Sequence, residues 1–149
     1  MEIKWVSVGK PLETYEIIEV EEFFGIKFPN DYVECLKVNA GGCPKPEVFD
    51  FKNHKEAVFN RLFTCDKADS HYFILDNYYA IKDRLIDNIY PIADDPFGNC
   101  ICFDYREGND KTPKIVFWDH EIAYGNPKNA ISYICDSFSE LLSKLYFCE

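Results

Sequence analysis

The chain has 149 residues, of which 47% are hydrophobic and 17% aromatic, and its 26 acidic and 16 basic side chains give a formal net charge of −10. This length and composition exclude a disordered chain and predict a single domain, residues 1–149, with a substantial core. No apolar run approaches the roughly 18 residues that cross a membrane, so we predict no membrane association. The negative charge disfavours nucleic-acid binding and favours a basic protein partner, although it could also serve only to keep the protein soluble.

The start of the chain and the cysteines indicate a cytoplasmic protein. The N-terminus lacks the basic segment and apolar run of a signal peptide. The seven cysteines form no Cys-x-x-Cys pair, and we predict that they are small, reduced hydrophobic residues. Cysteines and histidines do not supply the closely spaced ligand pairs of a zinc site, so no metal and no other cofactor is predicted.

The first predicted helix covers residues 13–24. Ile17, Val20 and Phe24 share one helical face, and Gly25 follows as a C-terminal stop. The glutamates of this segment are predicted to form a stripe that faces solvent (Glu13, Glu16, Glu19 and Glu22).

Four more elements are predicted between residues 28 and 87. A second helix opens at residues 28–32, where a proline and an aspartate suit the first turn, and it ends at the glycines of residues 39–42. Alternating apolar residues predict a short strand over residues 48–51. Helical spacing predicts helices over residues 54–63 and from about residue 71 to residue 87.

Residues 90–105 predict two strands around a tight polar turn. Ile101, Phe103 and Tyr105 alternate with the period of two that a strand requires. The turn, Asp94-Asp95-Pro96-Phe97-Gly98-Asn99, contains nearly every residue type that favours chain reversal. A third strand is predicted over residues 114–118, which makes the three strands an antiparallel meander.

The meander predicts which polar residues share one end of the sheet. Its third strand runs back toward the turn, so the residues that follow Trp118 should emerge beside it. We call this surface the acidic edge, and it is predicted to gather four carboxylates, an amide and an imidazole (Asp94, Asp95, Asn99, Asp119, His120 and Glu121).

The last predicted helix follows Ser137, which forms a capping box with Glu140. Phe138, Leu141 and Leu145 share the apolar face of this helix. We therefore expect the helix to pack on the sheet.

One interpretation of the acidic edge is chemical. Carboxylates and an imidazole are ligands for divalent metals, so Asp94, Asp119, His120 and Glu121 could form a metal-dependent hydrolase site. Adjacent aspartates are common in turns, however, and this pattern is far less specific than His-Glu-x-x-His.

A second interpretation is structural. Asp94 and Asn99 would brace the turn, and Asp119 and His120 would pair locally at the end of the sheet. This accounts less well for the number of ionisable groups at one edge.

The third interpretation is protein binding, which we favour. Trp118, Tyr90 and Tyr124 would provide aromatic anchors, and the carboxylates would select a basic partner. A regulatory scaffold would use the same kind of surface.

The order of these motifs resembles the SMI1/KNR4 (SUKH) superfamily. The matching segments run through most of the chain: Phe28-Pro29-Asn30-Asp31-Tyr32, Asn39-Ala40-Gly41-Gly42, Pro91-Ile92-Ala93-Asp94, Gly98-Asn99, Asp104, Trp118-Asp119-His120-Glu121 and Ser137-Phe138-x-Glu140-Leu141-Leu142. Ala40 departs from the pattern, since the family commonly has glycine there.

The resemblance implies an α+β fold, a mostly antiparallel sheet with a central meander and helices packed around it. It also implies a non-catalytic role. Bacterial members typically act as immunity proteins that neutralise a toxin domain, often a nuclease, and fungal relatives regulate cell-wall synthesis through protein contacts. The partner-binding residues expected from the resemblance and the acidic edge together are Asp94, Asp95, Asn99, Trp118, Asp119, His120 and Glu121.

Overall fold

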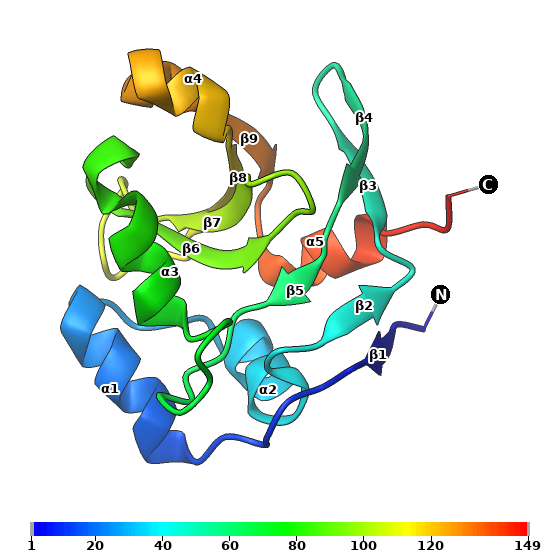
Figure 1. The fold of residues 1–149 in the computed structure, drawn as a ribbon, viewed down its shortest axis with the longest axis vertical. Coiled ribbons are helices and arrows are strands. Elements are labelled where there is room, and N and C mark those ends of the chain that lie inside the picture. The colour runs from blue at the N-terminus through cyan, green and yellow to red at the C-terminus, as the bar shows by residue number, and fades with distance from the viewer. Residues whose placement is uncertain (1, 149) are drawn as a thin grey trace.

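Five antiparallel strands form the main sheet of the computed structural model, which describes residues 2–148 (Figure 1). Their order in the sheet follows their order in the chain: β5 (Arg61–Leu62), β6 (Ile89–Asp94), β7 (Cys100–Asp104), β8 (Lys114–Trp118) and β9 (Ile131–Cys135). The predicted meander is confirmed as β6, β7 and β8, with Tyr90 opposite Phe103 and Phe103 opposite Ile115. The predicted α+β class with a mostly antiparallel sheet is likewise confirmed.

Two smaller antiparallel pairs accompany this sheet. They are β1 (Lys4–Val6) with β2 (Cys43–Lys45), and β3 (Val48–Phe51) with β4 (His54–Val58). The predicted strand over residues 48–51 is confirmed, but the helix predicted over residues 54–63 is wrong, because this segment forms β4 and β5. Phe49 pairs with Ala57 across the β3–β4 hairpin, so pairing with a distant strand outweighs a short helical pattern.

Helices cover the sheet on more than one side (Figure 1). The α-helices are α1 (Thr14–Phe24), α2 (Asn30–Asn39), α3 (Ile74–Ile81), α4 (His120–Gly125) and α5 (Phe138–Lys144), and the short 3-10 helices are η1 (Lys82–Arg84) and η2 (Pro127–Ala130). The predicted helices at α1, α2 and α5 are confirmed. The helix predicted from residue 71 to residue 87 is shorter than expected. None of these helices, over residues 2–148, is long and apolar enough to cross a membrane.

The glutamates of α1 do not all face solvent. Glu16 is buried, and its carboxylate accepts a hydrogen bond of 2.9 Å from the Glu13 N–H at the start of the helix. Tyr15, Ile18 and Phe23 are exposed instead. A capping box therefore replaces part of the predicted acidic stripe.

Capping of α5 also differs in detail from the prediction. The Ser137 side chain accepts a hydrogen bond from the Glu140 N–H, as expected. The Glu140 carboxylate instead accepts from the Asp136 N–H at 2.7 Å. One half of the predicted capping box is thus confirmed, and α5 packs against α2 and β9.

The predicted burial of the cysteines holds for most of them. Cys65, Cys100, Cys102 and Cys135 are buried and form no disulfide. Burial raises the pKa of the Cys65 thiol to about 12, so this thiol is protonated at neutral pH and packs as an apolar group. Cys148 differs because it is exposed.

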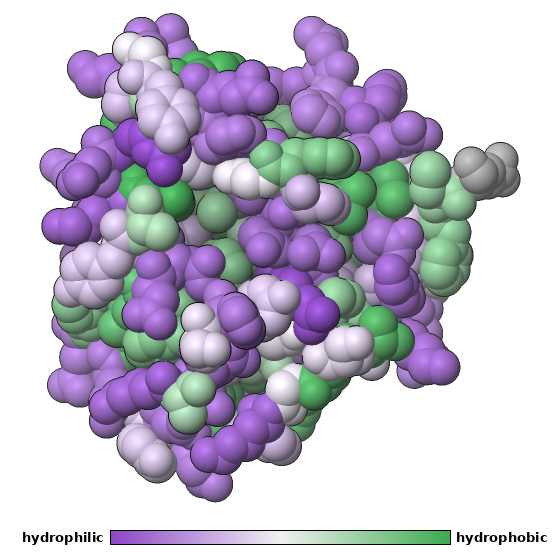
Figure 2. Space-filling model, in the orientation of Figure 1, coloured by the Kyte–Doolittle hydropathy of each residue, from purple (hydrophilic) through white to green (hydrophobic). Residues whose placement is uncertain are grey.

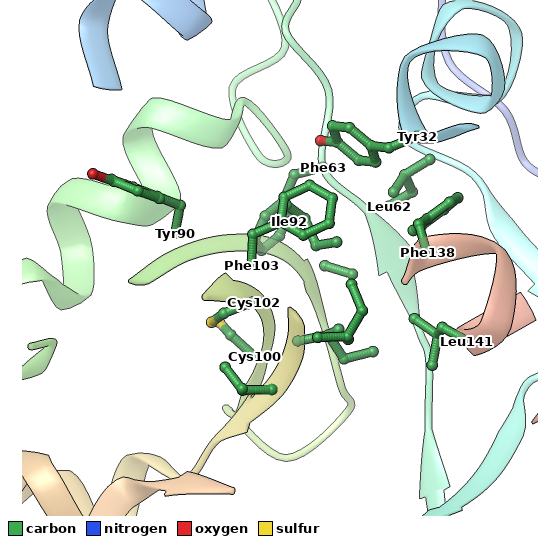
Figure 3. Close-up of a cluster of buried hydrophobic side chains, with 14 of the residues drawn as sticks. Tyr32, Leu62, Phe63, Tyr90, Ile92, Cys100, Cys102, Phe103, Phe138 and Leu141 are labelled. Atoms are coloured by element: carbon green, nitrogen blue, oxygen red, sulfur yellow. The ribbon is translucent and has the colours of Figure 1, made fainter. Parts of the chain in front are cut away.

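The core between the sheet and α2 is aromatic (Figure 3). The Tyr32 ring lies 4.9 Å from the Phe28 and Phe103 rings and 5.3 Å from the Phe138 ring, in edge-on contacts. Tyr32 is fully buried, and its hydroxyl has no hydrogen-bond partner within residues 2–148. This hydroxyl is therefore expected to be destabilising.

Replacing Tyr32 by Phe should raise the free energy of unfolding by about 1 kcal/mol, because it removes a buried hydroxyl that makes no hydrogen bond. Tyr105→Phe is a matched control, since the Tyr105 hydroxyl donates to the Lys27 carbonyl at 2.7 Å and its loss should destabilise the protein. Urea unfolding measures both variants. An equal loss of stability in both would show that the Tyr32 hydroxyl does form a stabilising bond.

Candidate functional site

The turn after β6 and the start of α4 meet at Asn99. Its Oδ1 accepts hydrogen bonds from the His120 backbone N–H at 3.0 Å and from the His120 ring Nδ1 at 2.7 Å. Its Nδ2 donates to Asp95 Oδ2, which fixes the orientation of the amide. Since an amide oxygen only accepts, Nδ1 of His120 carries a proton and Nε2 faces outward, 4.0 Å from the Glu121 carboxylate. The structure thus joins the two segments of the acidic edge through one amide.

Gly98 allows this junction to close. Its φ of +91° lies in the left-handed region, and a Cβ atom at this position would lie 3.4 Å from the His120 ring. The positive φ is therefore what requires glycine here, while a Cβ atom would make van der Waals contact with the His120 ring.

Gly98→Ala should lower the free energy of unfolding by about 1–2 kcal/mol, the cost of a side chain in a left-handed conformation. Gly125→Ala is a matched control, because Gly125 has open space around its Cα and no positive φ. Thermal unfolding followed by circular dichroism measures both. If Gly98→Ala were as stable as Gly125→Ala, the turn would not depend on this backbone conformation.

Asp95 lies inside the turn rather than on its surface. Its carboxylate is buried and accepts hydrogen bonds from the Phe97 and Asn99 backbone N–H groups, both at 2.8 Å, and from Asn99 Nδ2 at 2.9 Å. The structural interpretation gave the bracing of the turn to Asp94 and Asn99, but the aspartate that accepts these hydrogen bonds is Asp95.

Asp94 faces β5 rather than α4. Its Oδ1 accepts from the Arg61 backbone N–H at 3.0 Å and from Asn60 Nδ2 at 3.1 Å. Burial raises the pKa of the Asp94 carboxyl above its ordinary value, and these two hydrogen bonds oppose the rise only partly. Asp94 therefore holds the edge strand in register.

Asp119 and Glu121 differ in their environment. Asp119 is the N-cap of α4, and its Oδ1 accepts from the backbone N–H groups of Glu121 at 2.9 Å and of Ile122 at 3.2 Å. The Glu121 side chain is 85% exposed. Glu121 is therefore the carboxylate of the acidic edge that is most accessible to a partner.

The expectation that Trp118 and Tyr90 offer their rings to a partner is wrong, because both side chains are buried. The Trp118 Nε1–H donates to the Arg84 carbonyl at 3.1 Å. The Arg84 guanidinium lies 5.3 Å from the Trp118 ring centre and 4.5 Å from that of Tyr124. Trp118 therefore supports the site from beneath, and of the three expected anchors only Tyr124 is exposed.

Two exposed apolar residues of this surface were not predicted. Phe97, 71% exposed, stands in the middle of the polar turn, and Ile122, 46% exposed, lies in the first turn of α4. Phe97 lies in a tight polar turn, so its place in the sequence indicated a surface loop but did not show which way the ring points. Ile122 carried no such indication, because α4 is too short to show a face by periodicity. Hydrophilic residues predominate over α4 and the β3–β4 hairpin, with hydrophobic residues between them (Figure 2).

The geometry does not assemble the residues of the chemical interpretation into a metal site. Within residues 2–148, no group of three or more His, Cys, Asp or Glu side chains is placed to hold a metal ion. Asp94 and Asp119 are engaged by backbone N–H groups of different segments, and His120 is engaged by Asn99.

Comparison of the sequence with known proteins identifies the family of this chain. The SUKH_6 family model, described as SMI1-KNR4 cell-wall, matches residues 14–142, from α1 into α5 and across the whole acidic edge. The chain belongs to the SMI1/KNR4 (SUKH) family. This SUKH protein is also similar to the SPbeta prophage-derived uncharacterized protein YokK of Bacillus subtilis (strain 168), with 29% identity over 87% of this chain and 72% of YokK. The family resemblance inferred from the ordered motifs is thus confirmed.

Proposed function

We propose that this SUKH protein is a non-catalytic immunity protein that acts in the cytoplasm and neutralises a basic toxin domain of the nuclease class. Membership of a family that commonly provides immunity proteins supports this proposal, as does the net charge of −10. YokK, to which this chain is similar, is prophage-derived, which supports a role in competition between bacteria.

The observation that carries the proposal is the composition of the exposed surface around the Asn99–His120 junction. Phe97 of the turn and Glu121, Ile122 and Tyr124 of α4 are exposed, and hydrogen bonds between Asn99 and His120 join these two segments. Interfaces combine a few large anchors with charges that select the partner. We define the binding surface by these four residues, with Asp119 at its border.

Electrostatics explains why such a surface suits a nuclease. A nuclease must be basic where it grips the phosphate backbone. An acidic protein is attracted to that region, and once bound it competes with nucleic acid or blocks its access. The charges would mainly raise the association rate, and the apolar anchors would slow dissociation.

The proposal predicts that a toxin domain is encoded beside this protein, and that domain is the partner for the test. Wild-type protein should bind that domain and restore growth of cells that express it. Tyr124→Ala should weaken binding about 30-fold or more, the effect of losing a hot-spot aromatic residue. Isothermal titration calorimetry measures the dissociation constant.

Tyr133→Ala is the matched control, because Tyr133 is an exposed tyrosine on β9. It should bind as tightly as wild type. Equal losses in Tyr124→Ala and Tyr133→Ala, or unchanged affinity in both, would contradict the assignment of the binding surface. Absence of binding by the wild-type protein would contradict the proposed function.

A further inference from the structure

A hollow of about 350 Å³ lies between the β3–β4 hairpin and the end of the main sheet. The hairpin is a separate two-stranded sheet that contacts the main sheet at β9 (Figure 1). Asp119 and Ile122 of α4 line the hollow on one side, and His54 of β4 lines it on the other. The hollow is therefore continuous with the binding surface through Asp119 and Ile122.

Three aromatic rings form the wall of this hollow. Phe51 and His54 are stacked with their ring centres 4.9 Å apart and their planes 11° from parallel. Phe117 lies 4.9 Å from Phe51 and 5.7 Å from His54. Phe51 and Phe117 are buried and hold the exposed His54 in place, so the hollow presents flat ring surface to an incoming group.

Asp119, which also lines the hollow, keeps one carboxylate oxygen free of the hydrogen bonds that cap α4. Both capping hydrogen bonds of Asp119 use Oδ1, and within residues 2–148 its Oδ2 accepts no hydrogen bond. Lys52 is the cation that lines the hollow, and it lies exposed at the tip of the hairpin. A lysine with a flexible stem can keep its ammonium group in water while another cation approaches Asp119.

We propose that the hollow binds the guanidinium of an arginine side chain from the basic protein that covers the binding surface. A guanidinium is planar, stacks on aromatic rings and donates to carboxylate oxygens, which matches rings on one side and Asp119 Oδ2 on the other. A volume of 350 Å³ accommodates one such side chain. The identity of this partner rests on the proposed function, whereas recognition of arginine by the hollow can be measured without it.

The test uses N-acetyl-arginine amide as the probe and two-dimensional NMR of the labelled protein. We expect saturable shifts of the Asn53, Ile122 and Ser132 amides, with a dissociation constant on the order of millimolar. N-acetyl-citrulline amide has the same shape without the charge and should give no saturable shift. N-acetyl-lysine amide should bind more weakly than the arginine probe.

Two variants identify the side chains that bind the arginine probe. Asp119→Asn removes the charge but keeps a good N-cap for α4, and it should weaken binding of the probe at least about 5-fold. His54→Ala removes the exposed ring and should weaken it similarly. Asp76→Asn, which changes an exposed carboxylate of α3, is the matched control and should bind like wild type.

The outcomes separate this inference from the proposed function. Equal binding of the citrulline probe or of the lysine probe, or unchanged binding in both Asp119→Asn and His54→Ala, would overturn the arginine site. If the toxin domain binds wild type and His54→Ala equally tightly, the proposed function stands and the arginine site is not used. If the probe binds as expected but the toxin domain does not bind at all, the arginine site stands and the immunity role fails.

Discussion

Trp118→Ala is expected to lower the free energy of unfolding by about 3–5 kcal/mol, the usual cost of truncating a buried tryptophan. Trp118 is fully buried on β8, where it pairs with Cys100 of β7. The substitution removes the packing of the indole, its hydrogen bond to the Arg84 carbonyl and the ring beneath the Arg84 guanidinium. Urea unfolding at neutral pH measures the change.

Trp118→Phe is the control, because it keeps an aromatic ring but loses the Nε1–H donor. We expect Trp118→Phe to keep a large part of the stability that Trp118→Ala loses. If Trp118→Ala unfolded at the same urea concentration as wild type while toxin binding was abolished, Trp118 would be a partner contact rather than a core residue, and our description of the site would be wrong.

Asp95→Ala is expected to lower the free energy of unfolding by about 3 kcal/mol. Hydrogen bonds to a buried charged acceptor contribute roughly 1.5–3 kcal/mol to stability. The substitution leaves the Phe97 and Asn99 N–H groups without their acceptor and frees the Asn99 side chain. Since Asn99 also holds His120, the start of α4 should loosen together with the turn.

Asp95→Asn separates these contributions. Its side-chain oxygen can still accept from the two backbone N–H groups, but an amide nitrogen cannot accept from Asn99 Nδ2. We expect a smaller loss of stability than in Asp95→Ala, measured by the same unfolding experiment. Equal stability of wild type and Asp95→Ala would show that the turn does not depend on this carboxylate.

The parts of the fold that were predictable are those with a strong local pattern. The turn at Gly98 is flanked by clear alternation, so β6, β7 and β8 were predicted from the sequence. Helix α1 was predicted from the spacing of Ile17 and Val20, both of which are buried. Such patterns reflect one buried face of a single element, which the sequence records directly.

The parts that were not predictable depend on distant neighbours. The residues of β4 have a helix-like spacing of apolar residues, but in the structure they pair with β3. Strand β9 was not predicted, because it is stabilised by pairing with β8 rather than by a local pattern. The same limit applies to the site. The approach of Asn99 to His120 followed from strand direction, but the burial of Trp118 and Asp95 depends on packing that no local pattern reveals.

Hydrogen–deuterium exchange of the protein with and without the proposed toxin domain tests the central claim most directly. The claim is that a basic protein covers the surface formed by Phe97, Glu121, Ile122 and Tyr124. We predict slower exchange in residues 95–99 and 119–125 when the toxin domain is present. Slower exchange confined to other segments, with these two unchanged in a tight complex, would contradict the account.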